Sequence, residues 1–312
     1  MRKIIILLAF CTTFSLLGSA QYYLDYGARM GISNYLGDIG GLQGTARPWI
    51  LDMKLQETRW NFGGYARYKI HDPFSIEADL DYLRLSGADS LSTNPGRRGR
   101  NLDFRNDVLD LSIKGNWTFY ENPDLGNTYR YQNSFDAFLT IGVSFLWSNP
   151  KGYGDPPGGH GYGWYSLQPL ETEGVHYNRF QPGIPVGAGF DFTLSKTLRI
   201  GWQIEWTETF TDYLDDISGT YPTAAQQANM SPEALYFSNR NPQIPASVTD
   251  VPEYNNYGPG QKRGDPSDHD SFLTATVTVG YVIRGRSNFY RAHYGGLFSK
   301  GKYRMRRRRA KF

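Results

Sequence analysis

Three carboxylates close together near the end of the chain could bind a cation. Asp265, Asp268 and Asp270 lie within six positions of one another. Carboxylate oxygens are preferred ligands of hard cations such as Ca²⁺. The spacing lacks the central glycine and the final glutamate of a calcium-binding loop, so calcium binding stays an open question at this point.

A hydrolase would need a nucleophile, a base and an acid. Ser166, His176 and Glu173 are residues of the types that some lipid-modifying hydrolases place at a loop edge, but most chains of this length contain such residues. No two histidines stand four residues apart on a predicted helix, so no zinc motif is present. The single cysteine, Cys11, lies in the leader, which leaves the mature chain without a thiol. We expect no enzymatic activity, no metal centre and no cofactor.

The first twenty residues read as a secretory signal peptide. A basic start at Arg2 and Lys3 precedes an apolar run from Ile4 to Leu17, and the small residues 18–20 supply a cleavage site. Three regions are therefore predicted: a signal peptide over 1–20, a body over 21–283 and a C-terminal tail over 284–312. No later segment has the eighteen or more consecutive apolar residues that a transmembrane helix needs.

The charge of the body and that of the tail have opposite signs. Residues 284–312 hold eleven Lys and Arg and no Asp or Glu. When these and the two leader bases are set aside, 20 bases remain against all 30 acids, a net charge of −10 for the body. Such a tail could bind an anionic lipid surface, an acidic protein face or nucleic acid, or it could be a solvated extension.

The body shows strict alternation of apolar and polar residues in eight segments, each about as long as a transmembrane strand. These segments are 22–33, 58–70, 74–82, 109–119, 135–147, 184–194, 198–206 and 273–283. Their charged faces would line a narrow lumen in which opposite charges pair, and they include Arg67, Lys69, Glu77, Asp79, Asp81, Arg199 and Glu205. Eight strands leave no room for an open channel, which disfavours a solute porin.

Short and long connections alternate along the body. Residues 71–73 and 195–197 form short turns, and 120–134 is of moderate length. The long loops are 34–57, 83–108, 148–183 and 207–272. This layout predicts an all-β fold: an eight-stranded antiparallel transmembrane β-barrel with long extracellular loops and a basic periplasmic C-terminal tail. A water-soluble β-sandwich, the alternative, would not alternate its loop lengths so regularly.

Two loop segments have a distinctive composition. Residues 148–182 are rich in Gly, Pro and aromatic side chains, which fits either a surface for a partner or glycan or, as we expect, an irregular loop that packs on its own aromatics. Residues 224–237 have a helix-forming composition, and Ser231-Pro232-Glu233 resembles a helix start.

A local motif follows the first predicted strand. Residues 33–38 read SNYLGD, and Gly40 and Gly41 follow shortly. Gly37 permits close backbone approach, while Asn34 and Asp38 can satisfy turn amides, so a tight turn at the barrel rim is the expected role of these residues and of Tyr35, with direct partner contact as the alternative. In its position after the first strand, the motif resembles that of the PorG-like outer-membrane proteins of Bacteroidota.

The resemblance implies a component of the type IX secretion and gliding machinery. Barrels of that family sit in the outer membrane and contact a periplasmic ring made of a lipoprotein and its partner. We therefore expect periplasmic ring proteins and outer-membrane lipid as partners, no nucleic acid, and a non-enzymatic anchoring role. A small lipid-modifying or ligand-binding outer-membrane barrel is the alternative function.

The tail is the predicted partner-binding segment. Its basic residues supply undirected attraction, and its aromatic residues supply anchors. The residues expected to contact the partner are Phe289, Tyr290, Tyr294, Phe298, Tyr303, Arg306, Arg307, Arg308 and Arg309.

Overall fold

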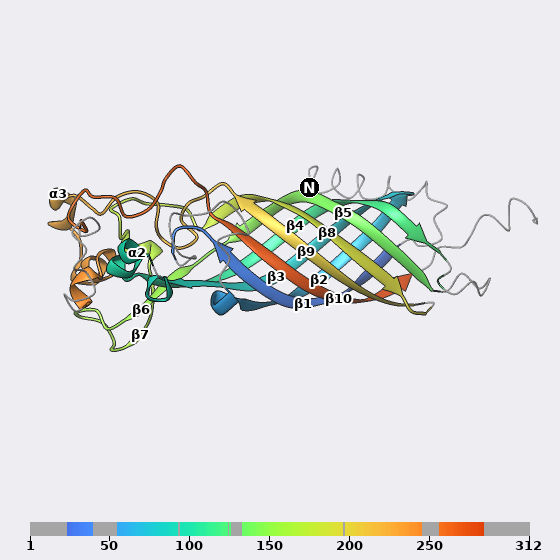
Figure 1. The fold of residues 1–312 in the computed structure, drawn as a ribbon, viewed down its shortest axis with the longest axis horizontal. Coiled ribbons are helices and arrows are strands. Elements are labelled where there is room, and N and C mark those ends of the chain that lie inside the picture. The colour runs from blue at the N-terminus through green and yellow to red at the C-terminus, as the bar shows by residue number, and fades with distance from the viewer. Residues whose placement is uncertain are drawn as a thin grey trace, which may run out of the picture.

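A computed structural model describes residues 24–39, 55–92, 94–123, 125, 133–195, 197–244 and 256–283. Within these residues, eight antiparallel strands close into a barrel, in which each strand pairs with the strand on either side of it. The pairing of β3 with β4 joins the two ends of the sheet. The first and last strands pair to complete the circle (Figure 1). The barrel strands are β1 (Leu24–Leu36), β2 (Arg59–His71), β3 (Phe74–Ala88), β4 (Asp103–Asn122), β5 (Ser134–Trp147), β8 (Phe180–Thr193), β9 (Leu198–Thr209) and β10 (Ser271–Ile283).

The alternation of side chains along the strands separates an apolar outer face from a polar lumen. On β1, Met30 is 65% exposed on the outside, whereas the neighbouring Arg29 is buried inside the barrel. The same outward apolar face recurs around the barrel, with Phe62, Leu80, Ile113, Ile141, Val186 and Val279 among its members. A continuous apolar girdle around a polar interior is the lipid-facing surface of a membrane-spanning β-barrel. The predicted fold class is confirmed.

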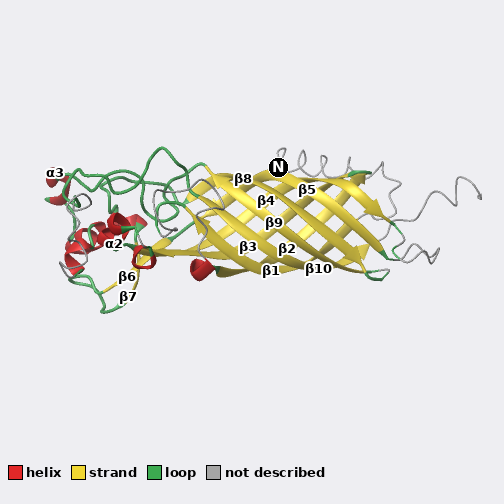
Figure 2. Cartoon of the chain, in the orientation of Figure 1, coloured by secondary structure: helices red, strands yellow, loops and turns green. Residues whose placement is uncertain are grey.

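The helices of the described residues lie outside the barrel wall. The described residues contain no helix long and apolar enough to cross a bilayer. Figure 2 shows the helices gathered at the end with the long loops, here called the long-loop end. They are the α-helices α2 (Pro95–Arg100), α3 (Ala224–Gln227) and α4 (Pro232–Ser238), and the 3₁₀ turns η2 (Leu55–Glu57), η3 (Asp89–Leu91), η4 (Gln168–Leu170) and η5 (Asn241–Gln243).

The helical prediction for residues 224–237 is confirmed in its position and its start signal. The Ser231 side chain accepts the amide of Ala234 at 3.1 Å, which satisfies one of the unpaired amides at the N-terminus of α4. Thr223 and Gln226 form a reciprocal capping box at the start of α3.

The prediction of a loop over 83–108 is wrong at both ends. Strand β3 continues to Ala88 and β4 begins at Asp103, so the two strands remain paired well beyond the predicted limits. The reason is a change of character on the inward face. Below this level β3 points carboxylates into the lumen, whereas Leu83 and Leu85 occupy the same face above it and are fully buried. The alternation reverses its phase here, because the inward residues turn apolar and Arg84 between them faces outward, although the strand itself goes on.

Those leucines belong to a cluster of buried side chains at the mouth of the barrel, here called the rim core. It joins the barrel wall to the long loops through Tyr35, Ile39, Leu83, Leu85, Leu102, Phe104, Val108, Leu146, Leu214, Ile217 and Phe272. Burial of apolar side chains gives these loops the same driving force that a small soluble domain has. The long loops therefore close the barrel mouth.

The loop over 148–183 is also more regular than predicted. Residues 150–166 form a hairpin of β6 (Pro150–Gly154) and β7 (Gly163–Ser166), which extends the sheet from β4. Part of the expected packing of the loop on its own aromatics occurs, since the Tyr153 ring lies 5.3 Å from the Trp164 ring. Tyr162, in contrast, is 76% exposed.

Both ends of the barrel sequence lie at the other end, here called the short-turn end. Leu24 is the cross-strand partner of Ile283. Residues 72–73 join β2 to β3, and residues 194–197 join β8 to β9, at the same end. The segments before Leu24 and after Ile283 therefore leave the barrel on the same side.

Candidate functional site

The lumen is filled by two linked layers of buried ion pairs. In the layer nearer the long-loop end, Arg29 of β1 and Lys114 of β4 both pair with Glu205 of β9, at 2.6 and 2.5 Å, and both also pair with Asp79. Lys114 reaches Glu77 at 3.2 Å, which connects this layer to the next. The three strands lie around the barrel, so these contacts cross the interior.

The second layer lies nearer the short-turn end. Arg67 of β2 pairs with Glu77 at 2.5 Å and also contacts Asp191. Arg199 of β9 pairs with Asp25 of β1 at 2.7 Å. The prediction that lumen charges of both signs pair across a narrow interior is confirmed for these residues.

The ion pairs determine what the barrel can conduct. Lys114 and its carboxylate partners are almost fully buried, and an eight-stranded barrel has space only for its own side chains. With the rim core above them, these layers leave no continuous water path for a solute through the described part of the chain. The lumen charges therefore stabilise the barrel, because removing one partner of a buried pair leaves the other charge buried and unpaired.

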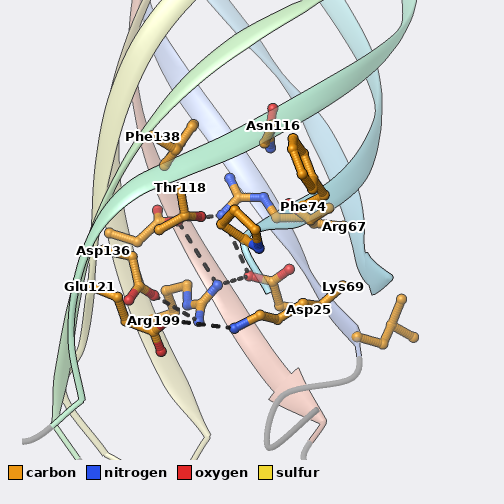
Figure 3. Close-up of a pocket in the computed structure, with 14 residues that line it drawn as sticks. Asp25, Arg67, Lys69, Phe74, Asn116, Thr118, Glu121, Asp136, Phe138 and Arg199 are labelled. Atoms are coloured by element: carbon orange, nitrogen blue, oxygen red, sulfur yellow. Dashed lines mark hydrogen bonds and ion pairs between the residues drawn. The ribbon is translucent and has the colours of Figure 1, made fainter. Parts of the chain in front are cut away.

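Below the second layer, the short-turn end opens into a charged recess. It holds about 520 Å³ of free space, its solvent-filled mouth included. Figure 3 shows Asp25, Arg199, Asp136, Glu121 and Lys69 converging around it from different strands. Arg199 approaches Asp136 at 3.5 Å, and Lys69 approaches Glu121 at 3.9 Å.

The recess has two unsatisfied acceptors. The Oδ1 atoms of Asp136 and Asn116 are buried and lack a hydrogen-bond partner among the described residues. Guanidinium, ammonium and carboxylate groups at such a mouth can form charge-assisted hydrogen bonds with polar or ionic groups.

The predicted motif residues lie at the opposite end, in the rim core. Tyr35 is 3% exposed and donates a hydrogen bond of 2.5 Å to Oδ1 of Asp270, which directly precedes β10. Its ring meets Phe104 edge-on with a centroid distance of 4.7 Å. A Cβ on Gly37 would lie 2.1 Å from the Tyr35 hydroxyl and 2.2 Å from Asp270, so the position admits only glycine.

The other two motif residues hold neighbouring segments. Asn34 donates to the Thr58 hydroxyl at 3.0 Å, which ties β1 to the start of β2. Asp38 accepts the amide of Asp265 at 2.7 Å, and its carbonyl accepts from Arg100 at 2.7 Å. Asn34 and Tyr35 thus lie at the end of β1, and Gly37 and Asp38 lie in the bend that follows it at the barrel mouth. The buried position of Tyr35 leaves it no surface for direct contact with a partner.

A second carboxylate of the rim core has no counterpart in the sequence prediction. Asp215 accepts the Ile39 amide at 3.1 Å and the Ile217 amide at 2.9 Å, and it is 1% exposed. Burial raises the pKa of Asp215 well above its usual range, and nearby Asp38 raises it further. Burial likewise raises the pKa of Asp212 to about 8. The only sequence signal was the Asp215-Asp216 pair in an otherwise mixed loop.

The structure does not bring together the residues that the sequence offered as a cation site or as a hydrolase site. Asp270 points into the rim core, whereas Asp265 pairs with Lys262 at 2.8 Å. The described residues contain no group of three His, Cys, Asp or Glu side chains placed to hold a metal ion. His176 pairs with Glu171 at 2.9 Å, and Glu173 is bound to Arg263 at 3.0 Å.

Ser166 lies in β7, and the structure shows no hydrogen bond from it to His176 or Glu173. The predicted contact residues of the tail, 289–309, lie outside the described residues, as does the signal peptide over 1–20.

Three solved bacterial proteins match the chain at low similarity. OprG from Pseudomonas aeruginosa is 10% identical, with a TM-score of 0.35 over 86% of this chain and 99% of that one. Ail of Yersinia pestis, in complex with the heparin analogue sucrose octasulfate, is 11% identical, with a TM-score of 0.33 over 84% and 99%. The N-terminal β-barrel domain of Pseudomonas aeruginosa OprF is 9% identical, with a TM-score of 0.31 over 84% and 98%. These values support no statement about function. No protein-family model matches the chain, and no curated protein matches it in sequence.

Proposed function

We propose that the protein is a non-enzymatic outer-membrane subunit that anchors a periplasmic complex of a protein-secretion machinery. The observation that carries this proposal is the pairing of Leu24 with Ile283 at the short-turn end of a closed, ion-paired barrel. In outer-membrane barrels the short turns face the periplasm and the long loops face outward. The tail over 284–312 then starts in the periplasm, one residue beyond the end of β10.

The tail and the barrel have complementary roles in this function. The barrel fixes the position of the protein in the bilayer and conducts nothing, because its lumen is filled. The tail offers eleven positive charges, which attract anionic lipid or an acidic protein surface at roughly 1 kcal/mol for each base near the membrane. Aromatic residues such as Tyr290 and Phe298 add the directed contacts that select one partner.

The charged recess extends the same binding surface onto the barrel. Glu121 and Lys69 are half-exposed at its mouth and Asp72 is exposed in the adjoining turn, all at the end where the tail begins. A partner held by the tail therefore meets a polar rim that can fix its orientation through hydrogen bonds.

The SNYLGD motif is our reason for proposing one particular secretion machinery. Its resemblance to PorG-like proteins makes the type IX secretion and gliding apparatus the proposed context, with the periplasmic ring of a lipoprotein and its partner as the bound complex. In this reading the motif itself stabilises the barrel rim, and the tail makes the contact.

Deleting residues 285–312 tests the function. The truncated barrel should insert and keep its heat-modifiable electrophoretic migration, because β10 ends at Ile283. The ring proteins should no longer co-purify with it in mild detergent, and secretion should stop. A full-length control with Arg306 to Arg309 changed to Gln separates charge from length, and it should weaken co-purification without abolishing membrane insertion.

Two results would reject the proposal. Unchanged secretion and unchanged co-purification of the truncated protein at physiological salt would make the tail a solvated extension. Lipid A altered by the purified protein alone would favour the alternative, a lipid-modifying barrel.

A further inference from the structure

The hairpin of β6 and β7 ends the sheet with an unpaired strand. The strand order runs from β4 to β6 to β7, and β7 pairs with β6 alone. Figure 1 shows the hairpin at the edge of the long-loop end, outside the barrel wall. Its surroundings are therefore those of a water-exposed domain and not those of the lipid-facing wall.

One face of this hairpin packs tightly on α4. A Cβ on Gly152 would lie 2.9 Å from the Phe237 ring, and one on Gly154 would lie 2.6 Å from the Tyr236 ring. Tyr165 of β7 turns to the same side and packs on Phe237 with a centroid distance of 5.6 Å. The two glycines let the hairpin approach the helix closely, so α4 covers this face of the hairpin.

The opposite face carries its large side chains into solvent. Tyr153, Tyr162 and Trp164, here called the aromatic face, are 44%, 76% and 41% exposed. The Tyr153 ring lies 5.3 Å from that of Trp164 and 6.3 Å from that of Tyr162, so the three form one patch. Exposed groups of this kind mark interaction sites, because Tyr and Trp offer a rigid apolar body with a polar edge.

The main chain beside this face is also unpaired. The Leu167 amide donates to the Pro150 carbonyl at 2.9 Å, which sets the hydrogen-bonded pairs of the hairpin at alternate positions. The N–H and C=O groups of Trp164 and Ser166 consequently point away from β6. None of the residues that the structure describes bonds to them.

Apart from its short length of four residues, the edge lacks the devices that normally block strand addition. Residues 163–166 read Gly-Trp-Tyr-Ser, without the proline, charge or bulge by which exposed edges are usually protected. An unpaired strand edge of this composition is a template for another extended chain.

Three cations next to the aromatic face share one carboxylate. Asp107 pairs with Arg84 at 2.6 Å, with Lys151 at 3.5 Å and with Arg105 at 3.8 Å. The Arg105 guanidinium also lies over the Trp164 ring at 4.4 Å from its centroid. Two positive charges remain in excess in this group, which disfavours a basic ligand and favours a partly apolar segment without Lys or Arg.

We propose that the free edge of β7 binds an extended, partly apolar polypeptide segment without basic side chains by strand addition. Main-chain hydrogen bonds to Trp164 and Ser166 supply the affinity, and the aromatic face receives apolar side chains from alternate positions of the added strand. This binding site goes beyond the proposed anchoring function and does not depend on it, since the tail leaves from the opposite end of the barrel.

Two substitutions distinguish the contribution of the main chain to binding from that of the side chains. Ser166→Pro removes one amide on the free edge and leaves the bonds to β6 intact, a position at which edge strands tolerate proline. Ser166→Ala is its matched control, because it removes the hydroxyl and keeps the amide. Trp164→Ala removes the largest ring of the aromatic face, and Trp164→Phe retains an aromatic group there.

The probe is a displayed library of short random peptides, panned on the full chain in lipid nanodiscs. We expect enriched peptides with alternating apolar residues, whose Kd, measured by fluorescence anisotropy, rises about tenfold with Ser166→Pro and with Trp164→Ala. Ser166→Ala and Trp164→Phe should stay near the wild-type value. N-methylation of the peptide amides should abolish binding at every second position and leave it unchanged at the positions between.

Three outcomes would overturn the inference. One is the absence of any enriched peptide, and another is a Kd unaffected by both Ser166→Pro and N-methylation. The third is binding of a neutral oligosaccharide such as maltoheptaose that is lost with Trp164→Ala and kept with Ser166→Pro, which would assign the aromatic face to a glycan. Circular dichroism and protease resistance of each variant confirm that a loss of binding does not come from misfolding.

Discussion

Gly37 is the position at which one added methyl group should open the mouth of the barrel. The space for its Cβ is occupied by the Tyr35 hydroxyl at 2.1 Å and by Oδ1 of Asp270 at 2.2 Å. These two atoms are hydrogen-bonded to each other at 2.5 Å in a buried site. Gly37→Ala must therefore push them apart, which breaks the contact between the first strand and the start of the last.

The size of the effect follows from two terms. Leaving a buried donor or acceptor without its hydrogen bond costs about 1–3 kcal/mol. Overpacking by one methyl group in a close-packed site costs about 1–3 kcal/mol. Since the two costs share atoms and do not add fully, a loss of about 3 kcal/mol in the local stability of the rim core is expected, which corresponds to roughly a hundredfold change in an opening equilibrium.

Amide hydrogen exchange measures this opening directly. The Ile39 amide is bonded to Asp215 and the Leu214 amide to the other oxygen of Asp270, so both should lose about a hundredfold of protection in Gly37→Ala. Amides in the middle of β10 should keep theirs.

The matched control is Gly115→Ala, where the nearest atom to an added Cβ is the Ile141 carbonyl at an ordinary 3.8 Å. Equal protection of Ile39 and Leu214 in the two variants would refute the reasoning.

The other predictions concern the lumen and the pH dependence of the rim. Lys114→Met removes the one cation that pairs with Glu205, Glu77 and Asp79 together and should destabilise the barrel by about 3–5 kcal/mol in urea unfolding from lipid vesicles, whereas Lys69→Met at the half-exposed mouth should cost less than about 1 kcal/mol. Burial raises the pKa of Asp212 to about 8, so the folded rim binds more protons than the unfolded chain between about pH 4 and pH 8, and its stability should fall as pH rises through that window. Limited proteolysis of the long loops at increasing pH should therefore accelerate, and Asp212→Asn should flatten this dependence; acceleration at falling pH would contradict the assigned sign.

The strands of the barrel could be predicted because their signal is local. Alternating side chains along a strand meet lipid on one side and the lumen on the other, and each segment shows this without reference to any other. The prediction failed where the interior changed from polar to apolar, at Leu83 on β3 and at Val108 on β4. The pattern of a membrane strand is an apolar outer face with a polar inner face, and here the two faces exchange character, since Leu83 and Leu85 point inward and Arg84 points outward.

The candidate sites depended on contacts that no local pattern contains. Asp270 stands in the sequence beside Asp265 and Asp268, which suggested a cation site, yet its carboxylate is bound by Tyr35, 235 positions earlier in the chain. The aromatic loop over 148–182 could have packed inward or outward with the same composition. Its orientation was decided by the close approach of Gly152 and Gly154 to α4.

By itself, the sequence determined the strand number, the alternation of short and long connections, the polar lumen and the basic segment that follows the last strand. Only the tertiary structure decided which charges pair across the lumen, that the SNYLGD motif is buried in the rim core, and that β7 keeps a free edge. The reason is barrel closure: it brings β1 against β10, and Arg29 of β1 against Glu205 of β9, 176 positions away. Contacts between such distant segments depend on the whole ring of strands, whereas the inward or outward direction of a side chain depends only on its place along one strand.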